Sequence, residues 1–280
     1  MLKPLKVGNC WFEWGKRTYI VGILNVTPDS FSDGGLYYRL EAALKQAERL
    51  IEAGADIIDI GGESTRPFSK PVPVEEELSR VIPVIEGIRK RFDIPISIDT
   101  YKAKVAKEAL EAGAQIVNDI SALRFDPQMS QVVAEYQAPV ILMHMKGTPQ
   151  TMQIDPSYED VIGEIKDFLS RRAEEAQKAG IKREKIILDP GIGFGKRIED
   201  NLKIIKEIKA FFDLGYPVML GPSRKSFLGQ ILDKEARERD AGTMAVVALA
   251  AYQGVHLVRV HNVEMAVDTI KVIQALKEVQ

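Results

Sequence analysis

Several polar residues of this 280-residue chain stand at the ends of short apolar runs, where a buried strand would not need them. Asp99 and Asp189 each end such a run, and Asn118 lies at the end of another. A buried carboxylate is costly unless it is paired, and a suitable neutral partner is a set of fixed N–H donors such as an amino-pyrimidine edge. These side chains therefore predict a site that grips a flat, nitrogen-rich ring. For Asp99 alone, a helix cap is an equally good interpretation, because Asp99 and Thr100 precede a helical pattern.

Positive and titratable side chains end the last two runs. Residues 223–225 (Ser-Arg-Lys) end one run, and Arg259 and His261 lie at the end of the other. Guanidinium forks and imidazole suit oxyanions, and the last two strands of a parallel barrel often carry a phosphate site. Surface ion pairs are the alternative, although strand alternation places Arg259 and His261 on the same side. The pattern predicts an anion site, whereas His256, at the start of its run, is expected to be a core or surface residue.

Eight runs of this kind alternate with helical patterns along the chain. Glycines suited to the left-handed residue after a helix precede several of them, as at Gly54 and Gly113. Alternating strands and helices with short links predict a parallel sheet, and eight strands favour a closed barrel. We therefore predict a single (β/α)8 TIM barrel, in which the C-terminal strand ends converge on one mouth. The runs cover residues 20–25, 57–63, 96–99, 116–119, 140–144, 186–189, 218–225 and 255–261.

No linker or composition shift marks a second domain. Residues 1–19, with their aromatic side chains, are expected to form an N-terminal hairpin extension, and residues 20–280 to form the barrel. Two segments that follow strand ends, residues 25–36 and 61–74, are neither helix nor tight turn. Such segments are usually lids or binding loops, with solvated linkers as the alternative.

The composition excludes several classes of function. The formal net charge is −2 and both signs are mixed, which gives no electrostatic case for nucleic acid or an anionic membrane. Cys10 is the only cysteine, so an internal disulfide and a thiolate metal cluster are excluded, and a reducing compartment is indicated. The longest apolar stretch, residues 243–258, is interrupted, and the N-terminus lacks the apolar segment of a signal peptide. We expect a soluble cytoplasmic protein.

The remaining motifs limit the cofactors. Residues 191–196 are glycine-rich but satisfy neither the P-loop spacing nor the dinucleotide fingerprint, so the glycines are expected to let backbone approach a ligand. The three histidines lack a metal-ligand spacing. A hard cation such as Mg²⁺ needs few protein ligands when phosphate oxygens supply the rest. Asn25, at the predicted mouth, is the candidate ligand.

Seven segments, in this order, closely resemble the dihydropteroate synthase family of pterin-binding enzymes, and the resemblance spans about residues 20–262. It implies a transferase of folate biosynthesis that joins 6-hydroxymethyl-7,8-dihydropterin diphosphate to p-aminobenzoate and releases pyrophosphate. The segments are 25–35 (NVTPDSFSDGG), 59–67 (DIGGESTRP), 118–120 (NDI), 143–149 (MHMKGTP), 189–196 (DPGIGFGK), 223–225 (SRK) and 259–261 (RVH).

The resemblance also implies roles for residues at the pterin. By this similarity the ring is held by Asp99, Asn118, Asp189 and Lys225, and Phe194 lies beside the pocket.

The diphosphate end is implied by the same similarity. Arg259 and His261 resemble the diphosphate ligands, with Arg259 also flanking the ring. Asn25 resembles the Mg²⁺ ligand, and Thr65 and Arg66 resemble contacts to the diphosphate and to the closing site.

The second substrate and the chemistry complete what the resemblance implies. Phe31, Pro67 and Ser226 would shape the p-aminobenzoate pocket, where sulfonamides compete. We expect a dissociative substitution under two closing loops, with electrostatic support of the cation from Asp33. Lys225, Arg259 and His261 join Asp33 as the expected catalytic set, and the family resemblance suggests a homodimer formed through barrel helices.

Three other interpretations remain open from the sequence. A pterin-binding methyltransferase shares the barrel and the acids but does not need the diphosphate cations. A catalytically silent pterin-binding protein would be expected to lack those cations. A sugar-phosphate isomerase predicts an acid or lysine base at the mouth, for which Glu63 is the one candidate.

Overall fold

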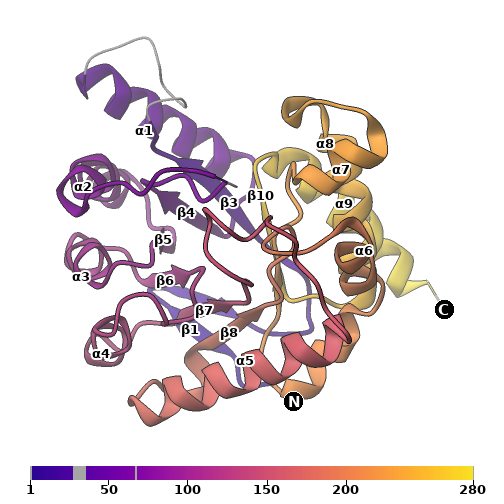
Figure 1. The fold of residues 1–280 in the computed structure, drawn as a ribbon. Coiled ribbons are helices and arrows are strands. Elements are labelled where there is room, and N and C mark those ends of the chain that lie inside the picture. Colours follow the sequence, from indigo (N-terminus) through magenta and orange to yellow (C-terminus); the bar gives the residue numbers. More distant parts are fainter. Residues whose placement is uncertain (1, 28–35, 67, 280) are drawn as a thin grey trace.

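Eight parallel strands form the centre of the computed structural model, which describes residues 2–27, 36–66 and 68–279 (Figure 1). The sheet runs in the order β8-β7-β6-β5-β4-β3-β10-β9, and a parallel bridge between Leu188 and Val218 nearly closes it into a barrel. The predicted TIM barrel is thus confirmed. The strands are β3 (Tyr19–Asn25), β4 (Ile57–Gly61), β5 (Ile96–Asp99), β6 (Ile116–Asp119), β7 (Val140–Met143), β8 (Ile186–Asp189), β9 (Met219–Leu220) and β10 (Leu257–Val260).

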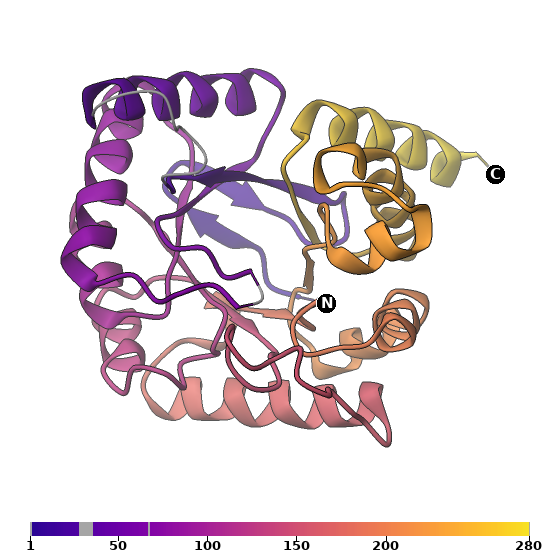
Figure 2. The same cartoon turned by 45° about the horizontal axis from the view of Figure 1, so that its top comes forward.

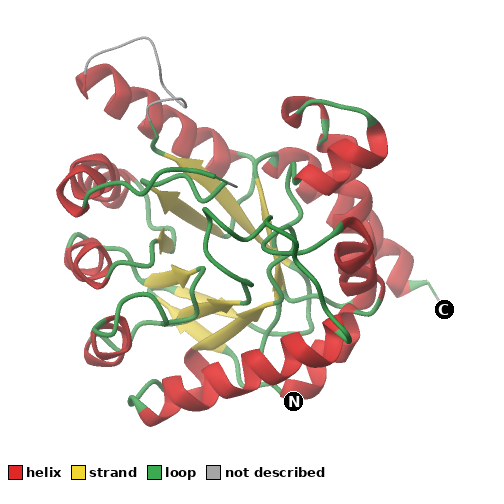
Figure 3. Ribbon diagram, in the orientation of Figure 1, coloured by secondary structure: helices red, strands yellow, loops and turns green. Residues whose placement is uncertain are grey.

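Helices surround the strands, and Figure 2 shows this ring from a second direction. Figure 3 separates the inner strands from the outer helices by colour. Gly54 and Gly113 follow helix ends with φ of 99° and 115°, as the sequence predicts. None of the helices within the described ranges is long and apolar enough to cross a membrane. The helices are α1 (Leu36–Glu52), α2 (Val74–Arg91), α3 (Ala103–Glu111), α4 (Met129–Glu135), α5 (Val161–Lys178), α6 (Ile198–Lys206), α7 (Ser226–Leu232), α8 (Asp240–Gln253) and α9 (Val263–Glu278), with short 3₁₀ turns η2 (Arg183–Lys185), η3 (Ile208–Leu214) and η4 (Ala236–Glu238).

The N-terminal hairpin closes the lower end of the barrel, which is the end where the strands begin. β1 (Leu5–Val7) and β2 (Cys10–Phe12) pair antiparallel, which confirms the predicted hairpin. Leu5, Val7 and Phe12 form one buried cluster with inward-facing residues near the starts of the strands. This packing excludes water from the lower end, so a ligand site belongs at the opposite mouth. The barrel members of the cluster are Tyr19, Val21, Ile57, Ile116, Ile141, Ile187, Met219 and Leu257.

Strand alternation makes the barrel interior apolar below and polar above. On β4, Ile58 packs outward in the core shared with the helices, whereas Ile57 faces the cluster below the mouth. Two residues further along each strand, the inward position is Asp59 on β4 and Arg259, after Leu257, on β10. Because inward positions recur every second residue, one register places both the apolar plug and the polar mouth.

Candidate active site

An ion-pair network lies inside the barrel at its mouth. Arg259 donates from Nε to Asp59 Oδ2 at 2.6 Å and from Nη2 to Asp99 Oδ2 at 2.7 Å. Asn118 donates from Nδ2 to the same Asp59 oxygen at 3.2 Å. The Asp59 side chain is fully buried, while the Asp99 side chain keeps 10% of its exposure. The helix-cap interpretation of Asp99 is wrong, because Lys102 occupies the N-cap position of α3.

Asp59 belongs to this network although it is not among the predicted site residues. It lies two residues before the end of β4, whereas the predicted site residues of the strands stand at strand ends. A carboxylate inside an otherwise apolar strand was the available signal, because such a group must be paired or must face a ligand.

Asp189 and Lys225 border the other side of the same opening. A Cβ atom built on Gly221 would lie 3.9 Å from Arg259 Cβ and 4.0 Å from Asp189 Oδ2, so Arg259 and Asp189 lie on either side of Gly221. Asp189 Oδ1 accepts the Gly191 N–H at 2.7 Å. The Lys225 ammonium lies 3.9 Å from the centroid of the Phe194 ring, in a cation–π contact.

The charges of these groups are set close to neutral pH. Burial raises the pKa of Asp99 to about 7, against the attraction of Arg259. Burial likewise raises the pKa of Asp189 to about 6 and lowers the pKa of Lys225 to about 8. Perturbed acids and a perturbed amine in one opening are typical of functional sites, because their charge states respond to a bound ligand.

Three buried polar atoms on inward-facing positions lack a hydrogen-bond partner among the described residues. They are Asp59 Oδ1, Asp99 Oδ1 and Ser97 Oγ. Leaving a buried acceptor unpaired costs about 1–3 kcal/mol, more when it is charged. The arrangement can therefore take N–H donors from a ligand, as a ring with amino and ring N–H groups would supply.

Ser223 and His261 form a pair just beyond the ends of β9 and β10. Ser223 Oγ lies 2.8 Å from His261 Nδ1 and accepts the His261 backbone N–H at 3.1 Å. Arg224, which the sequence analysis grouped with these residues, instead donates to both carboxylate oxygens of Asp240 at 2.7 and 2.8 Å. The expected group of cations at the anion site therefore loses Arg224.

His256 is a core residue, which is one of the two placements expected from the sequence. It is 8% exposed, and its Nδ1 accepts the Val218 N–H at 3.0 Å. Its ring packs edge-on against Phe212 and Trp14.

Glu63 anchors the segment between β4 and α2 instead of acting as a base. Its Oε1 accepts the Tyr101 hydroxyl at 2.6 Å, and its Oε2 accepts the Lys102 ammonium. Lys102 also pairs with the buried Glu77 at 2.5 Å. Because the Glu63 carboxylate is occupied by structural partners, the isomerase interpretation loses its only candidate base.

The same segment extends over the mouth. The Phe68 N–H donates to the Pro149 carbonyl, in the loop after β7, at 3.0 Å. Strands β5 and β6 lie between β4 and β7 in the sheet, so the segment bridges across them. Thr65, half-buried, and Arg66, exposed, lie on this bridge. Within the described part of the chain, no hydrogen bond or ion pair joins them to the ion-pair network below.

Four further expected residues are placed as follows. Phe31, Asp33 and Pro67 lie outside the residues that the structure describes. Ser226 is exposed as the first residue of α7, directly after Lys225.

Asn25 ends β3 at the same opening. A Cβ atom built on Gly61 would lie 3.7 Å from both Asn25 Oδ1 and Asp99 Oδ2. Within the described ranges, no group of three or more His, Cys, Asp or Glu side chains could hold a metal ion. One amide oxygen at the mouth fits a Mg²⁺ ion whose other ligands are phosphate oxygens and water.

Lys196 is a buried lysine that sequence reasoning did not assign. It is 3% exposed and donates to the Gly191 and Phe194 carbonyls at 2.8 and 3.0 Å. Its Nζ also lies 3.0 Å from His144 Nδ1, and burial lowers its pKa to about 7. The lysine thereby holds the glycine-rich turn that carries Phe194.

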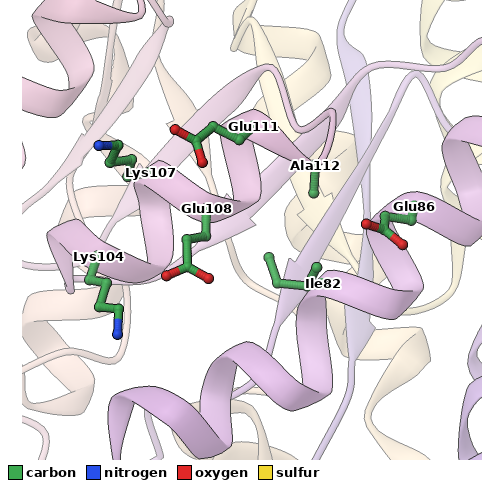
Figure 4. Close-up of a pocket in the computed structure, with 7 residues that line it drawn as sticks. All are labelled: Ile82, Glu86, Lys104, Lys107, Glu108, Glu111 and Ala112. Carbon is green, nitrogen blue, oxygen red and sulfur yellow. The ribbon is translucent and has the colours of Figure 1, made fainter.

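A groove between α2 and α3 lies on the helix layer, away from this network (Figure 4). Its lining mixes both charge signs with two small or apolar side chains, and no residue of the ion-pair network lines it. We assign it no ligand. The lining residues are Ile82, Glu86, Lys104, Lys107, Glu108, Glu111 and Ala112.

A parallel barrel whose mouth combines buried acids, an amide and cations suits an enzyme for a flat heterocycle that carries an anion. The chain belongs to the family of pterin-binding enzymes, whose model matches residues 21–261. It is 51% identical to the dihydropteroate synthase of Synechocystis sp. over 274 residues, which cover 98% of this chain and 95% of that relative. It is 47% identical to the dihydropteroate synthase of Escherichia coli over 257 residues, which cover 92% and 91%.

Solved structures agree. The dihydropteroate synthase of Yersinia pestis with a sulfonamide drug superposes with a TM-score of 0.94 at 41% identity, covering 99% of this chain and 100% of that chain. The enzyme of Xanthomonas albilineans with 4-aminobenzoic acid gives 0.93 at 43% identity, covering both chains completely. The same enzyme with 7,8-dihydropteroate gives 0.90 at 42% identity, covering 99% and 100%. The resemblance drawn from the sequence is confirmed.

Proposed function

We propose that this protein is the transferase that condenses 6-hydroxymethyl-7,8-dihydropterin diphosphate with p-aminobenzoate, giving 7,8-dihydropteroate and pyrophosphate. The observation that carries the proposal is the mouth itself, where unpaired buried carboxylate oxygens adjoin Lys225, Arg259 and His261. A methyltransferase acting on a pterin would not need cations for a departing diphosphate. A silent binding protein would not be expected to keep them.

The acids and the amide bind the pterin ring in this reaction. Asp189 Oδ1 is occupied by the Gly191 N–H, which leaves Oδ2 for a ring N–H or amino group. The unpaired oxygens of Asp59 and Asp99 accept from the other edge. Lys225 donates to the ring, with Phe194 packed against its ammonium.

The chemistry is a substitution at the methylene carbon. The C–O bond to the diphosphate breaks with its electron pair leaving on oxygen, and the ring delocalises the positive charge that develops. Arg259 and His261 stabilise the departing anion, and loss of one such preorganised donor lowers kcat by roughly 10²–10³-fold in other enzymes. The aniline nitrogen of p-aminobenzoate then forms the C–N bond and loses a proton, without a strong protein base.

Water must be excluded while the cation exists, so the two long segments are proposed to close over the mouth. Thr65 and Arg66 would contact the diphosphate from the segment that bridges β4 and the loop after β7. Asp33, in the first long segment, would support the cation electrostatically.

Phe31, Pro67 and Ser226 are proposed to shape the p-aminobenzoate pocket, where sulfonamides would compete. Similar enzymes have been solved with 4-aminobenzoic acid and with a sulfonamide, which supports binding of both compounds by this chain.

Mg²⁺ is proposed to bind at Asn25 together with diphosphate oxygens. When bound, the ion would neutralise part of the diphosphate charge. The position of Asn25 Oδ1 at the opening beside Asp99 supports this choice.

We further propose a cytoplasmic homodimer. The unpaired Cys10 fits a reducing compartment. Large apolar side chains are exposed on α8 and α9, two helices that pack against each other, and exposed apolar patches mark interfaces. They are Leu249, Tyr252, Met265, Val272 and Leu276.

The direct test is pyrophosphate release from the protein, pterin diphosphate and Mg²⁺, with and without p-aminobenzoate. We expect pyrophosphate release that depends on p-aminobenzoate. If the folded protein shows no such release, it is a silent binder or a methyltransferase. Lys225→Ala should weaken pterin binding strongly with the fold intact, whereas Lys234→Ala, an exposed lysine after α7, should not. Unchanged binding in Lys225→Ala would remove that lysine from the site.

A further inference from the structure

Ser223 contacts His261 twice through one oxygen atom. The hydroxyl oxygen accepts the His261 backbone N–H at 3.1 Å and lies 2.8 Å from the ring Nδ1. Ser223 is only 6% exposed, and Nδ1 is the one acceptor within hydrogen-bond distance of its hydroxyl among the described residues. A serine hydroxyl has a single hydrogen to donate. The hydroxyl hydrogen is paired within the described residues only if it is donated to Nδ1, and Nδ1 then carries no proton.

The imidazole is also uncharged. Burial lowers the pKa of His261 to about 3, and the surrounding positive charges of Arg224, Arg259 and Lys225 add to this effect. Asp240 acts in the opposite direction. A neutral imidazole with a bare Nδ1 carries its proton on Nε2.

We propose that Ser223 is a positioning residue that holds His261 as the neutral Nε2–H tautomer, so that the ring presents a hydrogen-bond donor to the departing pyrophosphate. The other tautomer would present a lone pair at Nε2, which repels an oxyanion. This inference rests on the proposed function for its role in catalysis, whereas the tautomer itself follows from the contacts of Ser223.

The neighbours of both residues keep the pair in register. Arg224, directly after Ser223, binds both oxygens of Asp240, and Asn262, directly after His261, donates to Asp240 Oδ2 at 3.1 Å. Arg224 has a φ of 57°, so its side chain turns away from the mouth toward α8. One carboxylate thus ties the loop after β9 to the end of β10. The Arg224 guanidinium is therefore engaged by Asp240 and is not available to the proposed anion site.

The test reads the tautomer directly by long-range ¹H–¹⁵N correlation NMR of the ¹⁵N-labelled full chain, without substrates. The chain has three histidines, so the spectrum of His261→Gln assigns the remaining signals. His256 and His144 serve as internal references. The Nδ1 atom of His256 accepts the Val218 N–H, and the Nδ1 atom of His144 faces the Lys196 ammonium. We expect the Nε2–H pattern for His261 in the wild type and in Ser223→Thr, which keeps the hydroxyl, and a mixed or reversed pattern in Ser223→Ala.

Activity then tests the catalytic consequence. Ser223→Ala should lower kcat roughly tenfold to a hundredfold, less than removal of a donor outright, with the KM for p-aminobenzoate unchanged. Ser223→Thr should keep kcat near the wild-type value, and Ser79→Ala, on α2, should have the wild-type kcat. A wild-type Nδ1–H tautomer, or Ser223→Ala with unchanged tautomer or kcat, would overturn the proposal. If the wild type releases no pyrophosphate, the proposed function fails instead, and the NMR result stands by itself.

Discussion

Replacing Arg259 with methionine should destabilise the fold in a way that depends on pH. The guanidinium is the partner of two buried carboxylates, at 2.6 Å from Asp59 and 2.7 Å from Asp99. Removing one member of a buried ion pair costs about 3–5 kcal/mol, because the other charge is left uncompensated. Here two acids lose their partner, so we expect a loss of at least about 3 kcal/mol in the free energy of unfolding at pH 8.

The loss should shrink as the pH falls. The pKa of Asp99 is already raised to about 7 with Arg259 present, and loss of that attraction raises it further. An acid whose pKa is higher in the folded state than in the unfolded state binds protons on folding. Stability therefore increases as the pH falls through the folded-state pKa, by up to about 1.4 kcal/mol per pH unit for one group. The difference between variant and wild type should thus be smaller at pH 5 than at pH 8.

Urea unfolding followed by circular dichroism at pH 8, 7 and 5 measures this difference. Asp213→Asn is the matched control, because its pair with Lys166 is exposed and should contribute less than about 1 kcal/mol at any of these pH values. The double variant Arg259→Met/Asp99→Asn should recover part of the loss, since one fewer unpaired charge is buried. A loss below about 1 kcal/mol, or one that is the same at pH 5 and pH 8, would refute the reasoning.

Three further outcomes are expected. The affinity for 7,8-dihydropteroate, measured by fluorescence titration, should be highest between about pH 7 and 8, because Asp99 and Asp189 lose their charges below their pKa values of about 7 and 6, and Lys225 loses its charge above its pKa of about 8; a flat profile would contradict this. Lys102→Met should lower thermal stability and raise the KM for p-aminobenzoate, because two buried acids that anchor the bridging segment lose their cation; an unchanged KM would separate this anchor from the site. Lys196→Met should weaken pterin binding, measured by calorimetry, with the KM for p-aminobenzoate unchanged, because the turn carrying Phe194 loses its internal donor; equal effects on both substrates would indicate only general loosening.

The barrel could be predicted because its signals are local and repeated. Apolar runs, helical stripes and glycines after helices recur along the chain, and each strand run contains or overlaps an observed strand. The least accurate boundary is the seventh run, predicted as 218–225 and observed as Met219–Leu220. Its second half leaves the sheet at Gly221 and Pro222, and the polar residues that follow belong to a loop.

The site was predicted in part, because side chains were read by type at strand ends. Asp99, Asn118, Asp189, Arg259 and His261 do converge, as the alternation of inward positions requires, and Lys225 reaches them from the loop after β9. Asp59 was missed because it lies one inward position below the strand end. Arg224 was misassigned because its partner, Asp240, and its left-handed backbone cannot be read from the residues beside it. The contacts of Lys196 depend on how two loops pack, and no local pattern encodes that.

The separation of acids from cations at the mouth lowers the stability of the unliganded protein and favours one orientation of the bound ligand. The acids lie on β4, β5 and β8. The unpaired oxygens of Asp59 and Asp99, and the burial that raises the pKa values of Asp99 and Asp189, destabilise the barrel without a ligand. The groups at the ends of β9 and β10 are positive or, as in His261, neutral donors. A ligand with N–H groups at one end and an anion at the other can pair with both the acids and these donors in only one orientation. The same residues that lower stability without a ligand would therefore orient the pterin with its diphosphate toward β9 and β10, and ligand binding should return that stability to the folded state.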